Sequence, residues 1–353
     1  MRAVVLQRAR RLNIIEKPVP EPGPGEALVR IEACGLSNRD FDAWYHGQVQ
    51  LPRVLGSEIV GRVVSIAESQ ASVAERELGG GGAMRRGTED VKIIPLYPSE
   101  GRSIEPGTRV VLSPYVETPG DGGQRLLGRD LDGGLQEYIC CPREQCYPVS
   151  DSLSLIELAC VAALAEALAI IDEMNIGERE TVVVSGAEEL GTFVALATAL
   201  RGGVPVLVDT SQARLEQARA AGVERIVNPF RSSVPDELEW IAPSGSADVV
   251  IETSGNRNAL PGLFANLVPG SRVGFTRSLD YDISVAALVE SGLRLVGLGT
   301  TLPNIEEAIE LVGGTEVVKT VTATVPLAEI PDKIPRIARA KKGVIKIVVT
   351  STA

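Results

Sequence analysis

The sequence predicts an α/β protein made of a β-rich domain and a doubly wound parallel-sheet domain. The first observation is that short β-rich runs separated by proline and glycine fill residues 1–66, which is typical of an irregular antiparallel domain. The second is that strands and helices alternate with short links from about residue 153, which is typical of a parallel sheet covered by helices. The chain of 353 residues is long enough to build a core for each domain.

The β-rich part begins with three apolar runs that predict strands: AVVL, ALVRIEA and VGRVVSIA. Proline and glycine, as in PVPEPGPGE, mark the turns between them. Residues 74–92 are rich in glycine and mixed in charge, so we expect a mobile excursion from this domain. Such a segment is either a tolerated insertion or a lid over a ligand, and both interpretations stay open.

The second part begins with helical periodicity over 155–175, followed by a buried strand, TVVVSG, and a helix to residue 201. Further along, the pattern predicts alternating strands and helices: strand 204–209, helix 211–222, the run ERIVNP, strand 247–253, helix 257–267, and strands 271–276 and 293–299. The chain then closes with an EEAIELV helix, a VVKTVTATV strand, a helix over 331–341 and a last strand, VIKIVVT.

The charge and hydropathy of the chain exclude several kinds of partner. The formal net charge is −11 and the basic residues are scattered among acids, which argues against nucleic acid and anionic membranes. A four-residue apolar run near the N-terminus is too short for a secretory signal, and Glu166 interrupts the apolar stretch 158–171. We therefore expect a soluble, cytoplasmic protein that acts on a small molecule.

The cysteine and histidine content limits the kinds of site that the chain can build. The five cysteines, at positions 34, 140, 141, 146 and 160, are odd in number and show no disulfide spacing. Two of them are adjacent in a predicted strand, so their side chains point to opposite faces. His46 is the single histidine, which excludes any site made of several imidazoles.

A dinucleotide-binding motif lies where the strand TVVVSG meets its helix. In Gly186-x-Glu188-x-x-Gly191 the first glycine would make the turn, and the last would let helix and strand pack closely. Asp209 ends the next strand, where an acid binds the adenine ribose of NAD and repels the extra phosphate of NADP. This context predicts a Rossmann-type domain. A purely structural interpretation also stands: the glycines serve packing, and Asp209 caps the helix that begins at Ser211.

Glu188 stands where this motif normally has its middle glycine. A carboxylate there brings bulk and a like charge toward the two cofactor phosphates, which predicts weak binding of NAD(H). Alternatively, the same carboxylate lies over the helix N-terminus as an internal substitute for phosphate.

The whole chain resembles the medium-chain dehydrogenase/reductase superfamily, which includes zinc alcohol and polyol dehydrogenases. The resemblance rests on EPGPGEALVRIEACG, LPRVLGSEIVGRVVSI, DGGLQEYICCP, the Gly186 turn, ADVVIETSGN and GVIKIVV. It implies a GroES-like catalytic domain of residues 1–152 plus 296–353 and a Rossmann domain of 153–295, with the active cleft between them. It also implies that Leu190, Thr253 and Ser254 belong to the cofactor site, and that the chain forms a homodimer through strand 293–299.

The resemblance places different residues where zinc members of the superfamily carry their metal ligands. SNRDFDAWYHG resembles the polyol-dehydrogenase stretch C-G-S-D-x-H-x-W-x-H-G, so Ser37 stands at the first ligand position and Ser57, in GSE, at the second. Glu166 stands at the third. Two hydroxyls and one carboxylate make a poor zinc site, and residues 113–132 lack the four cysteines of a structural-zinc lobe. We therefore expect no zinc. The family's proton-relay positions fall at Arg39 and Asp42.

Hydride transfer without a metal still needs a donor for the developing oxyanion. The resemblance places three donors near the former metal site: Ser37, Arg39 and Ser57. It places three residues there that exchange protons: Asp42, His46 and Glu58. For each, a structural role stays open, such as pairing of Arg39 with Asp42 or Glu58. Another alternative is an Mg²⁺ or Mn²⁺ site made by the carboxylates of Asp42, Glu58 and Glu166.

Two classes of function follow from these observations. The first is a zinc-independent, NAD(H)-dependent oxidoreductase that acts on a small alcohol, carbonyl or enone. The second is a catalytically silent relative with impaired cofactor binding, which serves as a binding or assembly subunit.

Overall fold

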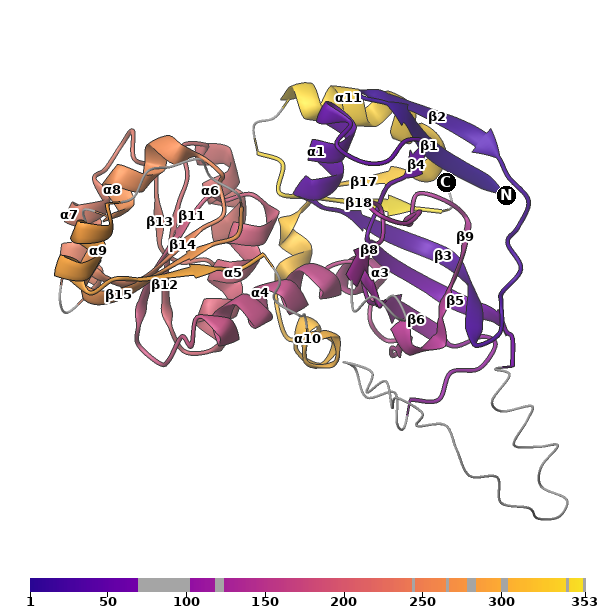
Figure 1. The fold of residues 1–353 in the computed structure, drawn as a ribbon, viewed down its shortest axis with the longest axis horizontal. Coiled ribbons are helices and arrows are strands. Elements are labelled where there is room, and N and C mark those ends of the chain that lie inside the picture. Colours follow the sequence, from indigo (N-terminus) through magenta and orange to yellow (C-terminus); the bar gives the residue numbers. More distant parts are fainter. Residues whose placement is uncertain are drawn as a thin grey trace, which may run out of the picture.

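The computed structural model describes residues 1–68, 102–117, 124–242, 245–264, 267–277, 284–299, 304–340 and 343–351. Figure 1 shows two lobes, one built around a parallel sheet and one around antiparallel strands, with α4 and α10 between them. The expected excursion at 74–92 lies outside the described residues. The predicted α/β class, a β-rich domain plus a doubly wound parallel sheet, is confirmed.

The parallel sheet has six strands in the order β13-β12-β11-β14-β15-β16. They are β11 Thr181–Ser185, β12 Val204–Val208, β13 Ile226–Val227, β14 Ala247–Glu252, β15 Leu267–Phe275 and β16 Arg294–Gly297. The β-branched residues of the central strands are buried on both faces, as a sheet covered by helices requires. The chain winds outward from β11 in one direction and then from β14 in the other. This switch point is where such sheets bind their ligands.

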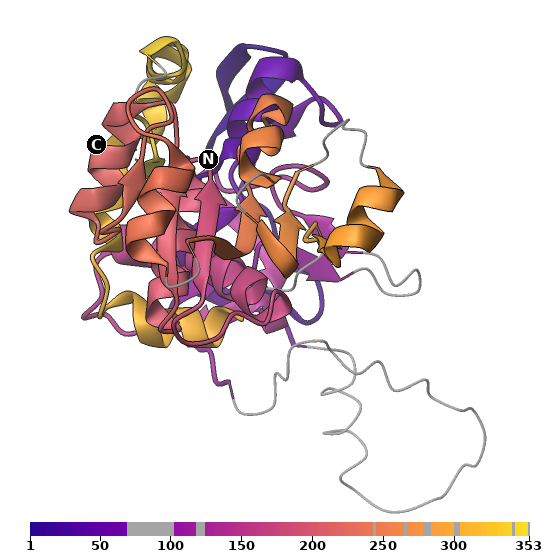
Figure 2. The same cartoon turned by 90° about the vertical axis from the view of Figure 1, so that its left-hand side faces the viewer.

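Helices cover this sheet and connect its strands, as the two views in Figures 1 and 2 show. They are α4 Val161–Glu173, α5 Glu189–Leu200, α6 Gln212–Ala220, α7 Val234–Ile241, α8 Leu260–Phe264, α9 Val285–Ser291 and the 3₁₀ turn Arg257–Ala259. The helix α4 is rich in alanine and leucine and is buried along most of its length, so it serves as a central packing element.

The β-rich lobe contains a seven-stranded sheet in the order β10-β6-β5-β3-β18-β17, with β9 also paired to β3. Its strands are β3 Glu26–Leu36, β5 Glu58–Ile66, β6 Arg109–Leu112, β9 Tyr138–Pro142, β10 Cys146–Pro148, β17 Val321–Pro326 and β18 Lys346–Thr350. Smaller sheets are formed by β1 Arg2–Arg8, β2 Arg11–Glu16 and β4 Arg53–Val54, and by β7 Tyr115–Glu117 and β8 Gln124–Leu126. The last strands of the chain therefore return to lie beside β3 (Figure 1).

Four helices belong to this lobe or join it to the other: α1 Asn38–His46, α3 Leu155–Leu158, α10 Ile305–Val312 and α11 Ile330–Ala340. Three short 3₁₀ turns accompany them: Arg143–Gln145, Val317–Thr320 and Leu327–Glu329. The largest group of buried side chains spans both lobes, since it joins Val60 and Val111 to Leu164 of α4 and Phe193 of α5. The lobes thus share one continuous core around α4.

Two local expectations differ from the structure. The run VVKTVTATV is a 3₁₀ turn followed by β17, so its first four residues are not a strand. The expected domain boundary between residues 295 and 296 falls inside β16, which pairs with β15 along its whole length.

The outer edge of the parallel sheet is β16, the strand expected to form the dimer seam, and the dimer itself stays a prediction.

The cysteine spacing predicts free thiols and opposite faces for the two adjacent cysteines. All five are free, and on β9 Cys141 is buried while Cys140 is half-buried on the other face. Among the described residues, no helix is both long enough and apolar enough to span a bilayer.

Gly191 is the position at which the fold depends most directly on a missing side chain. A Cβ there would lie 1.8 Å from the carbonyl oxygen of Gly186 and 2.5 Å from Oγ1 of Thr253. We expect Gly191→Ala to lower the free energy of unfolding by about 2–3 kcal/mol, because α5 must move away from β11. Gly262→Ala is the matched control, since its added methyl group meets nothing within 4 Å. Urea unfolding of both variants measures the difference, and equal stabilities would contradict this packing argument.

Candidate active site

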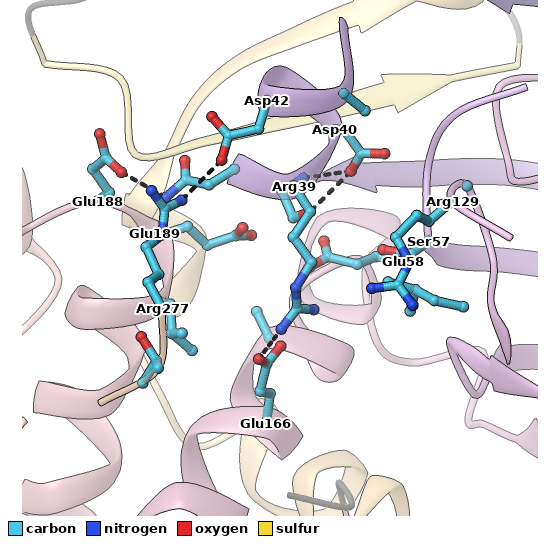
Figure 3. A pocket seen from close by; sticks show the side chains of 18 of the residues that line it. Arg39, Asp40, Asp42, Ser57, Glu58, Arg129, Glu166, Glu188, Glu189 and Arg277 are labelled. Atoms are coloured by element: carbon cyan, nitrogen blue, oxygen red, sulfur yellow. Dashed lines mark hydrogen bonds and ion pairs between the residues drawn. The ribbon is translucent and has the colours of Figure 1, made fainter. Parts of the chain in front are cut away.

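A cleft of about 460 Å³ lies between the lobes, at the switch point of the parallel sheet. Its wall is formed by α1, the start of β5, residues 126–129, α4, the turn 186–191 and the ends of β14 and β15. Figure 3 shows that charged side chains from both lobes point into it. A cleft at the carboxyl ends of parallel strands is where this kind of sheet binds its ligands.

The first residues of α1 are fixed by a buried carboxylate. Asp40 accepts hydrogen bonds from the backbone N–H and hydroxyl of Ser37, both 2.9 Å long, and from the N–H of Gly56 at 2.7 Å. Burial raises the pKa of Asp40, while these hydrogen bonds oppose the shift. The hydroxyl proton of Ser37 is therefore committed to Asp40. Sequence analysis missed Asp40, although the spacing Ser-x-x-Asp is a helix-capping pattern.

Arg39 lies in the cleft and forms an ion pair with Glu166 of α4. Neither of the expected partners, Asp42 or Glu58, pairs with it. The charge of Glu166 raises the pKa of Arg39, so the guanidinium stays protonated. Burial and then the charge of Glu166 raise the pKa of Tyr115, while the charge of the nearby Arg39 opposes the shift. No sequence pattern indicated Tyr115, because its partners are distant along the chain.

Three buried charges form a second cluster, which we call the Glu58–Lys346–Glu189 cluster. The ammonium of Lys346 pairs with both carboxylates, and the three side chains are 0%, 7% and 5% exposed for Lys346, Glu58 and Glu189. Burial and the charge of Glu58 raise the pKa of Glu189 to about 8. Burial also raises the pKa of Glu58, and the two carboxylates hold that of Lys346 above its usual value despite burial. One shared ammonium thus faces two carboxylates.

The backbone of β3 leaves room for this cluster. A Cβ at Gly35 would lie 2.0 Å from Oε2 of Glu58 and 3.0 Å from Nζ of Lys346. Sequence analysis assigned Glu58 to the site but missed Lys346, whose signal is a lone charge inside the apolar run GVIKIVV.

Asp42 and His46 do not join the residues around Arg39. Asp42 pairs across the cleft with Arg277, at 3.3 Å, and both side chains are partly exposed (Figure 3). His46 is the exposed last residue of α1, its ring lies edge-on against Tyr45, and it faces a neighbouring hollow instead. Asp42 and Glu58 thus line the same cleft while His46 lies outside it, and proton exchange by these residues stays a prediction.

The carboxylates considered for Mg²⁺ or Mn²⁺ do not converge either. Asp42, Glu58 and Glu166 are each paired with a different cation: Arg277, Lys346 and Arg39 respectively. A divalent ion would have to replace three separate ion pairs, so the structure does not bring these acids together as one site.

The glycine-containing turn has the geometry that its motif predicts. Gly186 has φ +103°, a conformation that favours glycine. Glu188 is the N-cap residue of α5, but its side chain makes no capping hydrogen bond. Its carboxylate instead accepts a 2.8 Å hydrogen bond from Asn38 of the other lobe and lies 3.7 Å from Arg214. The expectation that Glu188 lies over the helix N-terminus is therefore wrong, and the buried acid at this end is Glu189.

Asp209 is nearly buried at the end of β12, and its carboxylate is already engaged. It accepts hydrogen bonds from the N–H groups of Ala187 at 2.7 Å and Ser211 at 2.6 Å. Arg214 contacts both of its oxygens, at 2.8 and 2.9 Å. Asp209 therefore holds the turn to the start of α6, and Arg214 balances the negative charge that would repel the extra phosphate of NADP.

The remaining expected cofactor residues lie around the same turn. Leu190 is half-buried and lines the cleft. The hydroxyl of Thr253 donates to the carbonyl of Ser185 at 2.8 Å, and that of Ser254 donates to Glu252. Ser57 is buried and lines the cleft beside Glu58.

Comparison with known proteins finds similarity along the whole chain. Residues 23–80 match the alcohol dehydrogenase GroES-like domain. An uncharacterized zinc-type alcohol dehydrogenase-like protein of Haemophilus influenzae is 26% identical, over 98% of each chain. Sorbitol dehydrogenase of Bacillus subtilis is 24% identical, over 99% of this chain and 97% of the relative. A zinc-binding dehydrogenase of Sinorhizobium meliloti, solved bound to NADP, has a TM-score of 0.80 at 24% identity, over 99% of this chain and 98% of that one.

The Glu58–Lys346–Glu189 cluster predicts an effect of Lys346→Met on stability. Without the ammonium, two carboxylates share a dry site, so we expect the free energy of unfolding to fall by about 3–5 kcal/mol near neutral pH. The loss should be smaller near pH 5, because buried acids whose folded pKa is raised are held protonated, and this costs less free energy as the pH approaches their unfolded pKa. Lys333→Met is the control, since Lys333 pairs with Glu329 on the surface. Urea unfolding at both pH values tests this, and a loss no larger than the control's would contradict it.

Proposed function

We propose that this chain is a medium-chain dehydrogenase/reductase similar to the zinc-type alcohol dehydrogenases, and that it is an NAD(P)(H)-dependent oxidoreductase that acts on a small alcohol, carbonyl or enone without zinc. The observation that carries this proposal is the Arg39 guanidinium, which lies in the same cleft as the dinucleotide-type turn. A fixed cation beside a cofactor turn is the arrangement that metal-free carbonyl chemistry needs.

The residues at the zinc-ligand positions do not fit this metal. The Ser37 hydroxyl donates to Asp40, and the Glu166 carboxylate is paired with Arg39. Ser57 offers a third position with neither thiolate nor imidazole. Zinc prefers thiolate, imidazole or several free carboxylates, so this donor set is poor for it. We propose that the guanidinium supplies the positive charge in its place.

In this proposal, bound NAD(P)(H) accepts or supplies a hydride. The protein's own residues do the rest. Arg39 donates to the oxygen of the reacting C–O group and stabilises its negative charge as that charge develops. Glu166 fixes the orientation of Arg39 through their ion pair. We assign proton exchange to Glu58, because it is the one acid of the expected three that is buried in the wall of the cleft.

The turn and its surroundings support dinucleotide binding. Gly186 and Gly191 let the turn, α5 and residues 253–254 pack closely, and Leu190, Thr253 and Ser254 line the hollows where a cofactor would pass. Since Arg214 balances the charge of Asp209, we propose that the adenosine end tolerates both NAD and NADP. We also propose a homodimer through β16, the edge strand of the parallel sheet.

One observation favours the second function, a catalytically silent relative. Both acids of the turn already have partners within the chain: Glu188 binds Asn38, and Glu189 binds Lys346. These contacts occupy the groups that would otherwise face a cofactor, so a protein that never binds one would show the same arrangement.

Titration with NADH and NADPH separates the two functions. We expect both reduced cofactors to bind, weakly, with a rise in their fluorescence, and elemental analysis of the same sample to find far less than one zinc per chain. Oxidation of NADH is then followed with simple aldehydes, ketones and enones. Absence of binding to either cofactor would favour the silent relative, and stoichiometric zinc that survives dialysis would contradict the metal-free site.

Replacing Arg39 tests its proposed role directly. We expect Arg39→Met to lower kcat on the order of a hundredfold to a thousandfold, because the oxyanion loses its charged donor, while the Kd for NADH changes little. Arg39→Lys should recover part of the rate. Arg129→Met is the matched control, since Arg129 lines the same cleft but is paired with Asp130 at the exposed rim. Full kcat in Arg39→Met would rule out this role for Arg39.

A further inference from the structure

The two adjacent acids of the turn have different surroundings. Glu188 is partly exposed, and its carboxylate faces Asn38 and Arg214. Water and these two side chains therefore stabilise its charge. Glu189 is the first residue of α5, and its carboxylate is buried against Lys346. Both line the cleft. Only Glu189 therefore carries its charge in the protein interior at the start of this helix.

We propose that Glu189 determines the affinity of the cofactor site, because its carboxylate competes with the cofactor pyrophosphate for the positive end of α5, and that binding of the dinucleotide takes up one proton at Glu189. This inference rests on the proposed dinucleotide binding and adds to it the group that controls that binding. Glu189 acts here as a positioning and affinity-determining residue, not as a group that reacts.

Helix α5 begins at this turn, with Glu189 as its first residue. The N-terminus of α5 offers unpaired N–H groups and a partial positive charge, which is why pyrophosphate binds at such a turn. The Glu189 carboxylate sits in this same field, within the first turn of the helix. A bound pyrophosphate would add two negative charges near this buried carboxylate.

The Glu189 side chain cannot readily move away from a bound cofactor. It is buried, and it shares Lys346 with Glu58. When both carboxylates are ionised, the Glu58–Lys346–Glu189 cluster carries one uncompensated negative charge. Protonation of Glu189 removes that charge and keeps its hydrogen-bonding partner, so it costs less than moving the side chain.

The other charged or titratable groups that face Glu189 come from several elements packed around it. They are Lys346 on β18, Glu58 on β5, Cys160 at the start of α4, Glu166 on α4 and Arg39 on α1. The pKa values of Lys346 and Arg39 are raised, so both stay cations, and burial raises the pKa of Cys160 to about 12. The pKa of Glu189, at about 8, lies within the range where NADH is stable. Glu58 shares the same ammonium, and the variants below separate the two acids.

The test is the pH dependence of NADH affinity. In the wild-type chain we expect a nearly constant Kd below about pH 7 and a rise of about tenfold per pH unit above pH 8, because each binding event must then supply a proton. Calorimetry of NADH binding near pH 8.5 in two buffers of different ionisation enthalpy should report net proton uptake. NADH is preferred to NADPH, because its phosphates do not titrate in this range.

Two matched variants assign the effect. Glu189→Gln keeps the shape and a hydrogen-bond acceptor for Lys346, so we expect a Kd that is constant with pH and about tenfold lower than wild type near pH 9. Glu188→Gln is the control. It should keep the wild-type dependence of Kd on pH, because Asn38 and Arg214 already stabilise the charge of Glu188 in the wild-type chain. Circular dichroism and urea unfolding check that both variants are folded.

The outcomes separate this inference from the function beneath it. A wild-type Kd that does not change with pH, or a slope that survives in Glu189→Gln, overturns the role of Glu189 while leaving dinucleotide binding intact. Absence of NADH binding at every pH, in wild type and in Glu189→Gln, overturns both. The wild-type pH profile and calorimetry need no variant, so a variant that fails to fold does not rescue the proposal.

Discussion

One ammonium held between two carboxylates, out of contact with water, ties the two lobes together at the cleft. Lys346 comes from the β-rich lobe, as does Glu58, while Glu189 begins α5 of the parallel-sheet lobe. A buried charge is costly without its partner, so each member requires the others once the fold has closed around them. The cluster therefore fixes how the dinucleotide-type turn faces the β-rich lobe, and Gly35 provides the space that it needs.

The same principle organises the rest of the cleft. Arg39 is paired with Glu166 and Arg277 with Asp42, so every acid that a divalent metal would use has its own cation (Figure 3). Asp40 plays a different part, because it is buried and satisfied by hydrogen bonds from Ser37 and Gly56. The positive charge in this part of the cleft thus comes from arginine side chains, each paired with an acid.

Sequence reasoning succeeded where a local pattern decides the structure. The parallel sheet followed from β-branched runs, and the need for glycine at Gly191 followed from close packing of helix on strand. It failed where distant residues meet. The partner of Arg39 is Glu166, and Lys346 meets acids on two other elements, so no spacing along the chain predicts either contact. The error at the turn has a local cause: Glu188 is the N-cap residue with extended backbone, whereas Glu189 is the first residue of the helix, so the Glu188 side chain stays partly exposed while that of Glu189 is buried.

The strand that carries Lys346 also has a consequence for how the chain is made. In the seven-stranded sheet β18 lies against β3, with Ile347 opposite Leu36, and β17 lies beyond it. The entire parallel-sheet lobe is synthesised between these two partners. At translation rates of roughly 5–20 residues per second, the edge of β3 waits roughly 15–60 seconds for β18. During that interval the nascent chain presents an open strand edge and two acids without their ammonium, so completion of the β-rich lobe must wait for synthesis of the parallel-sheet lobe, and the edge is meanwhile left for chaperones to shield.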